Sequence, residues 1–246
     1  MTGQLAAYRF EWGLEGLEEL IPDVRVVVIV DTLRFTTAVS AVIESGGTVI
    51  PSRWADEGAA AVAARSDAVL AGRREDGGPS LSPTDLLTLP VGTRLVLPSP
   101  NGATLATTAA ELGVANVLAG CFRNATATAR RARELAAGAS IGVVASGERR
   151  ATGQLRAAVE DLLGAGAVLA ALDPAAATRP PCCSPEAAAA RAAFVAARPL
   201  LVDHLLASES GRQLVGWGWD DDVHASAALD VTDLAAQLVD GEFTAV

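Results

Sequence analysis

The feature that most constrains the fold is a β-branched run from Arg25 to Val30, which predicts a strand buried on both faces of a sheet. A helical pattern from Thr36 to Ser45 follows it and ends at Gly46-Gly47, a pair suited to a helix C-cap. The alternation continues along the chain, with strands expected at 48–50, 67–70, 94–97, 115–119 and 140–145 and helices at 56–65, 103–112, 125–136 and 155–172. This pattern predicts an α/β fold, here a three-layer α/β/α arrangement around a mostly parallel sheet.

The chain length of 246 residues suits one α/β domain with an appended lobe. We expect residues 1–172 to form an α/β core that carries the candidate active site. Residues 173–185 contain four prolines and predict a linker. Residues 186–246 are expected to form a C-terminal helical and mixed lobe, packed on the core as one unit. Its first helix, Glu186 to Ser208, should kink at Pro199.

The formal net charge of −10 argues against a protein that binds nucleic acid or anionic membranes. Met1 to Phe10 lacks the basic start and apolar run of a secretory signal, and no apolar run is long enough to span a bilayer. The three cysteines do not have the spacing of a metal site. These features predict a cytoplasmic protein, and they leave open whether it forms a homodimer.

All 19 basic residues are arginine. The absence of lysine excludes a P-loop lysine, a Schiff-base lysine and a pyridoxal-phosphate lysine. With only His204 and His224, a three-histidine zinc site is excluded as well.

Ligands of open parallel sheets bind outside the carboxyl ends of the strands, and Asp31 and Arg34 follow the first predicted strand. A carboxylate there can hold a divalent metal or attack phosphorus, and a guanidinium can bind phosphate, sulfonate or carboxylate. The alternative interpretation is an Asp helix cap beside an arginine in a surface ion pair. A nucleophilic Asp of the haloacid-dehalogenase type is excluded, because position 33 is Leu33 and the required lysine does not exist.

Two further turns lie at predicted strand ends. Asn101 and Gly102 precede a helix whose N–H groups could receive an anion, although an ordinary Asn-Gly turn is the simpler interpretation. The second turn contains Cys121, Arg123 and Asn124, and offers a guanidinium beside a helix start. Asn124 is most simply a helix cap, and Cys121 a small buried thiol rather than a nucleophile.

Three more carboxylates are candidate metal ligands. Glu148 lies at a strand end, and Glu160 and Asp161 lie in the helix that follows it. Adjacent helical residues point about 100° apart, so we expect only one of Glu160 and Asp161 to face a pocket. A solvated polar face is the alternative for this pair.

Taken together, these segments resemble the 2-phosphosulfolactate phosphatase (ComB-like) family over most of the chain. The resemblance lies in the order and spacing of several motifs, of which the strand running into Asp31-Thr32-Leu33-Arg34-Phe35-Thr36-Thr37 is the most specific. The others are Asn101-Gly102, the turn from Gly120 to Asn124, Glu160-Asp161, Ser210-Gly211-Arg212-Gln213-Leu214, Asp221-Asp222-Val223 and Leu229-Asp230-Val231.

Membership implies an α/β/α core and a Mg²⁺-dependent phosphatase that acts on a small sulfonated phosphate ester. The family name suggests coenzyme M synthesis as the pathway. On this basis Asp31, Arg34 and Glu160 are the expected catalytic residues, and Arg34, Asn101, Gly102, Arg123 and Asn124 bind the substrate. The expected ligands of Mg²⁺ are Asp31, Glu160 and Asp161, with Glu148 as a further candidate.

The chain departs from the family pattern in the loop from Gly72 to Thr84. Gly72 is followed by Arg73 where the family has Gly-Glu, the loop is several residues short, and Glu75 could substitute through a register shift. The Thr-rich lead into Asn-Gly is also replaced, by Pro98-Ser99-Pro100. These departures motivate a second hypothesis, a non-catalytic relative that binds an anionic metabolite.

Overall fold

In the computed structural model, described for residues 7–150, 152–174 and 182–246, the chain forms a mostly parallel sheet covered by helices on both faces. The three-layer α/β/α prediction is confirmed. The strands in sheet order are β1 (Tyr8–Trp12), β7 (Ile141–Ala145), β2 (Val26–Val30), β6 (Val117–Gly120), β10 (Ala236–Val239), β11 (Glu242–Ala245), β3 (Thr48–Ser52), β5 (Arg94–Pro98) and β4 (Val69–Leu70). Strands β8 (Glu148–Arg149) and β9 (Leu155–Arg156) form a separate hairpin.

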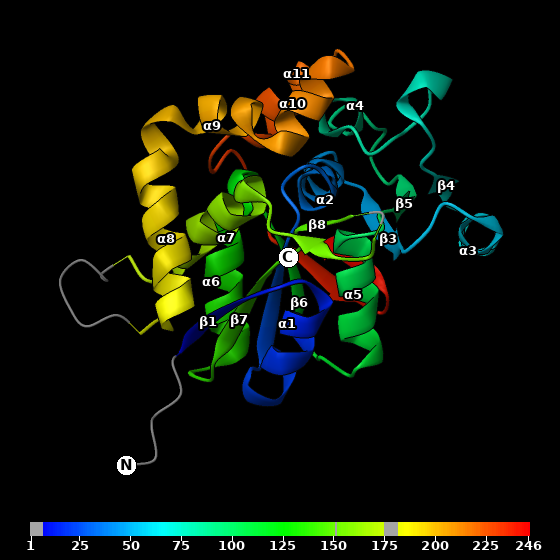
Figure 1. Cartoon of the computed structure of the whole chain (residues 1–246). Coiled ribbons are helices and arrows are strands. Elements are labelled where there is room, and N and C mark those ends of the chain that lie inside the picture. Colours follow the sequence, from blue (N-terminus) through cyan, green and yellow to red (C-terminus); the bar gives the residue numbers. More distant parts are fainter. Residues whose placement is uncertain (1–6, 151, 175–181) are drawn as a thin grey trace.

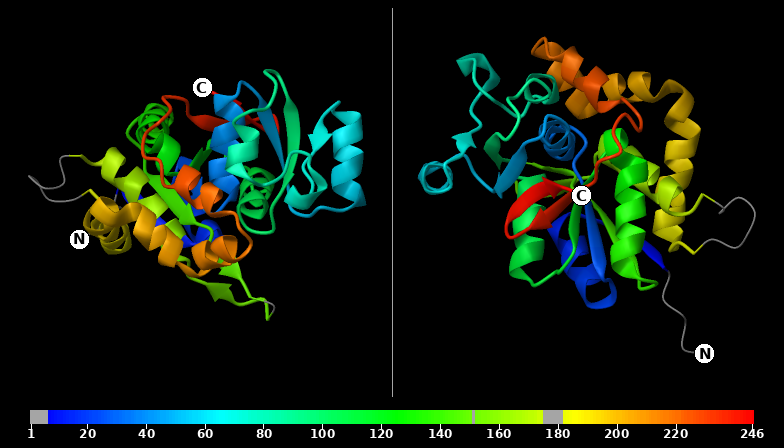
Figure 2. Two further views of the ribbon diagram at one scale, coloured as in Figure 1. Left: turned by 90° about the horizontal axis from the view of Figure 1, so that it is seen from above. Right: turned by 180° about the vertical axis from the view of Figure 1, so that it is seen from behind.

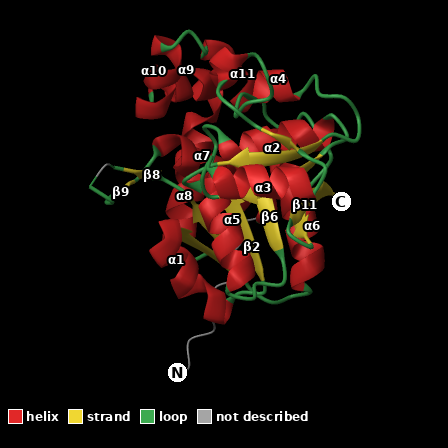
Figure 3. Cartoon of the chain, turned by 90° about the vertical axis from the view of Figure 1, so that its right-hand side faces the viewer, coloured by secondary structure: helices red, strands yellow, loops and turns green. Residues whose placement is uncertain are grey.

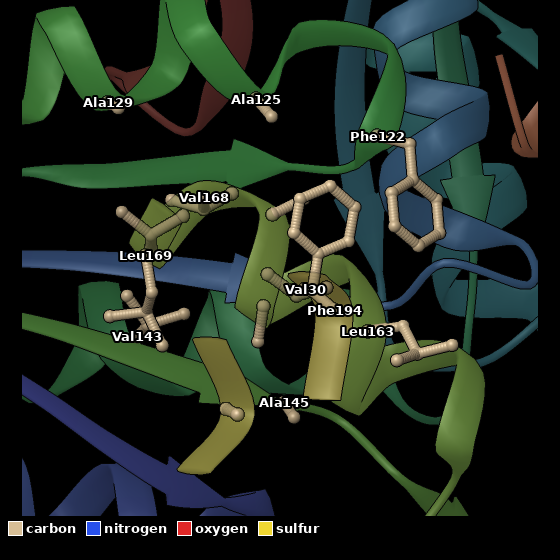
Figure 4. Packing of buried hydrophobic residues seen from close by; sticks show 14 of the residues in the cluster. Val30, Phe122, Ala125, Ala129, Val143, Ala145, Leu163, Val168, Leu169 and Phe194 are labelled. Atoms are coloured by element: carbon tan, nitrogen blue, oxygen red, sulfur yellow. The ribbon is translucent and has the colours of Figure 1, made fainter. Parts of the chain in front are cut away.

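Two buried clusters fill the spaces on either side of the sheet. On one face, Val28 and Val143 of the sheet pack against α6 (Ala125–Ala136), α7 (Val159–Leu172) and α8 (Pro185–Ala197). Phe122 and Phe194 stack there with ring centroids 6.0 Å apart (Figure 4). The second cluster joins the other face to α1 (Gly13–Leu20), α2 (Phe35–Glu44) and α5 (Gly102–Glu111). Side chains that alternate along β2 serve both clusters, which explains its continuous apolar sequence.

The remaining helices lie at the ends of the sheet. Helix α3 (Glu57–Arg65), packed on β5, lies at the end opposite α8 (Figure 2). Helices α9 (Leu201–Ala207), α10 (Glu209–Gly216) and α11 (Asp220–Ser226) gather with α4 (Pro83–Leu86) at the end of the molecule away from α1 (Figures 1 and 3). Pro199 lies in the 3-10 turn that separates α8 from α9, so the predicted kink is a break between two helices.

Two sheet segments were not predicted. Strand β1 pairs with β7 along the edge of the sheet. The antiparallel hairpin β10–β11 is inserted between β6 and β3, so the C-terminal residues lie in the middle of the sheet. Helix α7 begins at Val159 rather than Leu155, because Leu155 and Arg156 pair with β8. Of the predicted linker 173–185, positions 175–181 lie outside the described residues.

Candidate active site

Asp31 follows β2 and is held by the first N–H groups of two helices. Its Oδ1 accepts a hydrogen bond from the Phe35 N–H (3.2 Å), and its Oδ2 accepts one from the Gly102 N–H (2.8 Å). A Cβ atom on Gly102 would lie 2.7 Å from Asp31 Oδ2 and 2.5 Å from Phe35 Cδ1, so only glycine permits this approach. The carboxylate therefore has a fixed orientation at two positive helix ends.

The second fixed carboxylate is Asp161, in the first turn of α7. Its Oδ1 accepts from the Thr32 N–H (2.7 Å) and its Oδ2 from the Gly147 N–H (2.9 Å). Helix α7 packs tightly on the turn after β2, since a Cβ on Gly164 would lie 2.4 Å from Thr32 Oγ1. Asp31 accepts from Phe35, and Asp161, 130 residues away in sequence, accepts from Thr32. Both carboxylates are therefore bonded to the backbone of residues 32–35.

Glu160 is also buried, so the alternative of a solvated polar face for this pair is wrong. We expected one of the two carboxylates to face a pocket, but neither lines the pocket beside Asp31. Glu160 Oε1 lies 3.9 Å from an Arg156 nitrogen, and Glu160 Oε2 has no hydrogen-bond partner among the described residues. A buried oxygen without a partner costs free energy unless something outside the chain binds it.

The carboxylates repel one another. Burial, with smaller contributions from the charges of Glu148 and Glu160, raises the pKa of Asp31 to about 6 against the lowering effect of its two N–H bonds. Burial also raises the pKa of Asp161 well above its ordinary range, and the charges of Asp31 and Glu160 add to this. Carboxylates that share a buried site in this way favour a bound cation, which would offset both desolvation and repulsion.

A cavity of about 160 Å³ opens beside this cluster. Asp31, Arg34, Asn101 and Glu148 contribute to its lining. Asn101 Nδ2 donates to Glu148 Oε1 (3.1 Å), and the buried Asn101 Oδ1 has no partner within the described ranges. The structure therefore brings the turn after β5 and the β8 hairpin to the same cavity as Asp31.

The oxygens of this site suit a hard cation such as Mg²⁺, which prefers carboxylate and amide oxygens. Asp31, Glu148, Glu160 and Asp161 supply four carboxylates, and two buried oxygens, Glu160 Oε2 and Asn101 Oδ1, lack partners. Within the part of the chain that is described, no three acidic, cysteine or histidine side chains already converge at metal-binding distance. The types of donor in the site fit the expected metal.

Arg34 lines the same cavity as Asp31 and Glu148. One of its nitrogens donates to the fully buried Asp222 of α11, which also accepts from Ser82 Oγ (2.5 Å). Arg34 also lies 5.1 Å above the ring of Trp219. The alternative interpretation placed Arg34 in a surface ion pair, whereas the pair with Asp222 is buried. Arg34 also lines the cavity, and its binding of substrate stays a prediction.

Arg123 and Asn124 are not brought to the carboxylate cluster. Arg123 donates to Glu44 Oε2 (2.7 Å) and to the Ala225 carbonyl (3.1 Å), and its side chain is buried. The Asn124 side chain accepts from the Cys121 N–H (2.9 Å) and donates to the Ala119 carbonyl (3.1 Å), so it stabilises the turn before α6. Neither residue lines the cavity that contains Asp31.

Cys121→Ser should retain turnover within about threefold of the wild type, because burial raises the pKa of the thiol and keeps it protonated. The cysteine is fully buried behind this turn. Steady-state phosphate release checks this, with a melting curve to control for misfolding. Complete loss of turnover, with a phosphocysteine adduct detected in the wild type by mass spectrometry, would make the cysteine the nucleophile.

Sequence reasoning counted Gln213, Leu214, Asp221 and Asp222 among the motifs of the family resemblance but gave the α10–α11 region no role in the site. Trp217 lines the Asp31 cavity together with Gln213 and Leu214 of α10. Arg74 pairs with Asp221 (2.8 Å) and joins the Gly72–Thr84 loop to α11. The available signal was the sequence Gly216-Trp217-Gly218-Trp219, in which large aromatic side chains stand in a glycine-rich turn where little can bury them.

A buried carboxylate cluster at the carboxyl edge of a mostly parallel sheet, with an arginine in the lining of the same small cavity, is typical of an α/β protein that binds anionic ligands. Comparison with known proteins shows the family. The sequence model of the 2-phosphosulpholactate phosphatase family matches residues 15–241. The chain therefore belongs to this family, which is one of phosphoric monoester hydrolases.

Two relatives carry the same name. The 2-phosphosulfolactate phosphatase of Methanothermobacter thermautotrophicus is 31% identical over 211 residues, which cover 83% of each chain. The probable 2-phosphosulfolactate phosphatase of Thermus thermophilus is 35% identical over 153 residues, 59% of this chain and 60% of the relative. No helix in the described ranges has the length and apolar character needed to span a membrane.

Proposed function

We propose that this protein is a Mg²⁺-dependent phosphatase that hydrolyses 2-phosphosulfolactate, or a related small anionic phosphate ester, to the hydroxy acid and phosphate. The observation that supports the proposal most directly is the buried Asp31, held by the Phe35 and Gly102 N–H groups beside Glu160 and Asp161. The family names supply the substrate class.

In this proposal Asp31, Glu160 and Asp161 would hold Mg²⁺, with Glu148 of the cavity lining as a further candidate ligand. When bound there, the metal would supply polarisation of the phosphoryl oxygens and activation of water. Asp31 and Asp161 keep their orientation through four backbone N–H bonds, so little reorganisation is needed during turnover. Arg34 offers its guanidinium to the substrate anions while Asp222 holds it in place.

A non-catalytic relative that binds an anionic metabolite is the second candidate, favoured by Arg73 in place of the expected glutamate. Arg73 and Glu75 are both exposed and lie 3.5 Å apart on the loop. Neither lines the cavity that contains Asp31. The departure in this loop therefore leaves the carboxylate cluster itself intact.

Phosphate release separates the two candidates. The purified chain should release phosphate from 2-phosphosulfolactate, or from another short anionic phosphate ester, when Mg²⁺ is present and not when it is chelated. Saturable binding of the ester without any release of phosphate would favour the non-catalytic relative.

The affinity for Mg²⁺ should rise with pH. Asp31, with a pKa of about 6, and Asp161, with a pKa well above its ordinary range, both carry protons in the metal-free protein at acid pH. The cation must displace those protons, so binding should weaken at least tenfold from about pH 7.5 to about pH 5.5. Isothermal titration in buffers of different ionisation enthalpy measures affinity and proton release together. Equal affinity at the two pH values, without proton release, would contradict this assignment.

A further inference from the structure

A second and larger cavity lies next to the one that contains Asp31. Its volume is about 540 Å³, against about 160 Å³ for the first. The two cavities share Arg34, Leu81 and Trp217 in their linings, so these residues stand between them. The smaller cavity has room for only about five waters at ~30 Å³ each, whereas the larger one lies in the range of pockets that hold whole organic ligands.

The larger cavity is lined by three arginines whose surroundings differ. Arg34 and Arg74 contact Asp222, and Arg74 also pairs with Asp221, so both side chains are held in place by ion pairs. The side chain of Arg73 is 79% exposed, and its ion pair is with Glu75 at 3.5 Å, itself more than half exposed. A surface pair of this kind contributes little stability, so Arg73 can turn to another anion at small cost.

Of the residues shared by the two cavities, Trp217 is aromatic. Trp217 is 54% exposed and packs on Trp219 with ring centroids 5.0 Å apart. The Trp219 ring in turn lies under the guanidinium groups of Arg34 (5.1 Å) and Arg74 (5.6 Å), which fixes it. An exposed indole held against a fixed one offers an apolar surface, and a carbon chain or ring that covers it would gain free energy from burial.

From this arrangement we infer that the larger cavity is a specificity subsite for the part of the substrate remote from the phosphate. The preferred ester has an apolar or aromatic body that lies on Trp217, and a second anionic group, carboxylate or sulfonate, at its far end that pairs with Arg73. The inference rests on the proposed phosphatase function, and it extends the substrate class beyond esters as short as 2-phosphosulfolactate.

Three phosphate esters test the subsite: ethyl phosphate, phenyl phosphate and 4-carboxyphenyl phosphate. Arg73→Ala should lower kcat/KM for 4-carboxyphenyl phosphate about tenfold, mainly through KM, and change the other two less than about twofold. Trp217→Ala should lower kcat/KM for both aryl esters at least about fivefold more than for ethyl phosphate. Comparing each variant with the wild type on one ester cancels the difference in leaving groups.

Matched controls are available on the surface. Arg65→Ala removes another exposed arginine, and Trp54→Ala removes a tryptophan that is 59% exposed; neither lines the two cavities. Both controls should leave all three esters unchanged. Equal effects of Arg73→Ala on all three esters, or no effect on any, would overturn the inference.

If the wild type hydrolyses none of the esters, the phosphatase proposal fails and the subsite is tested by binding. Calorimetry then measures the affinity for 4-carboxyphenylphosphonate and for phenylphosphonate, neither of which has an ester bond. Arg73→Ala should weaken binding of the first about tenfold and of the second less than about twofold. Equal weakening of both, or of neither, would overturn the subsite itself.

Discussion

Asp31→Asn should lower kcat/KM by on the order of 100-fold or more while the protein stays folded. The substitution removes the charge at the centre of the carboxylate cluster and preserves the shape of the side chain. One of the two N–H bonds, from Phe35 or Gly102, is lost because the amide can present only one oxygen. Relief of the repulsion with Asp161 and Glu160 offsets that loss, so the melting temperature should change little.

The measurement is steady-state phosphate release beside a melting curve, with Asp203→Asn as a control of equal charge change. Asp203 is exposed on α9 and lies outside the Asp31 cavity. The control should match the wild type in both measurements. If kcat/KM of the Asp31→Asn enzyme lies within about threefold of the wild-type value, Asp31 has no role in the mechanism.

The position of Asp31 was accessible from sequence because the apolar run before it could only be a buried strand. The carboxyl end of a parallel strand marks the ligand edge, so the residue after Val30 was a candidate at once. The meeting of Asp31 with Glu160 and Asp161 was implied by the family resemblance. In the structure they come together because β2 and β7 are parallel neighbours and α7 follows β7. The burial of both acidic side chains of α7 was not predicted, because helical spacing alone does not show that α7 enters the core.

The C-terminal hairpin was missed although its turn has a strong local signal. Asp240 and Gly241 both have positive φ and link Val239 to Glu242 in a two-residue turn, for which Asp-Gly is a preferred sequence. No local sequence pattern indicates that this hairpin is inserted between β6 and β3. That placement depends on pairing between residues more than 100 positions apart, such as Ala236 with Ala119.

The two candidate arginines show a limit of the rule that ligands bind at the carboxyl ends of parallel strands. Arg34 and Arg123 both follow parallel strands that are neighbours in the sheet, and sequence reasoning gave them the same role. Their partners separate them, because Arg34 lines both cavities whereas Arg123 is bonded to Glu44 and to the Ala225 carbonyl. The partner of each arginine comes from a segment remote in sequence, so only the folded structure could assign it.

Arg123→Ala should therefore destabilise the fold by about 2–4 kcal/mol and change kcat/KM less than about twofold. The guanidinium links the turn before α6 to Glu44 at the end of α2 and to α11, and truncation removes both bonds and leaves a buried gap. Glu44 keeps partial access to water, which holds the cost below that of a fully buried pair. For a chain of this length the melting temperature should fall by roughly 5–15 °C.

A double-mutant cycle with Glu44→Ala separates the ion pair from packing. If the pair carries the effect, Glu44→Ala alone should destabilise the protein, and adding it to Arg123→Ala should cost little more. Additive losses in the cycle would assign the effect to packing around Arg123 instead. If Arg123→Ala leaves the melting temperature unchanged and lowers kcat/KM tenfold or more, Arg123 binds the substrate and the structural assignment is wrong.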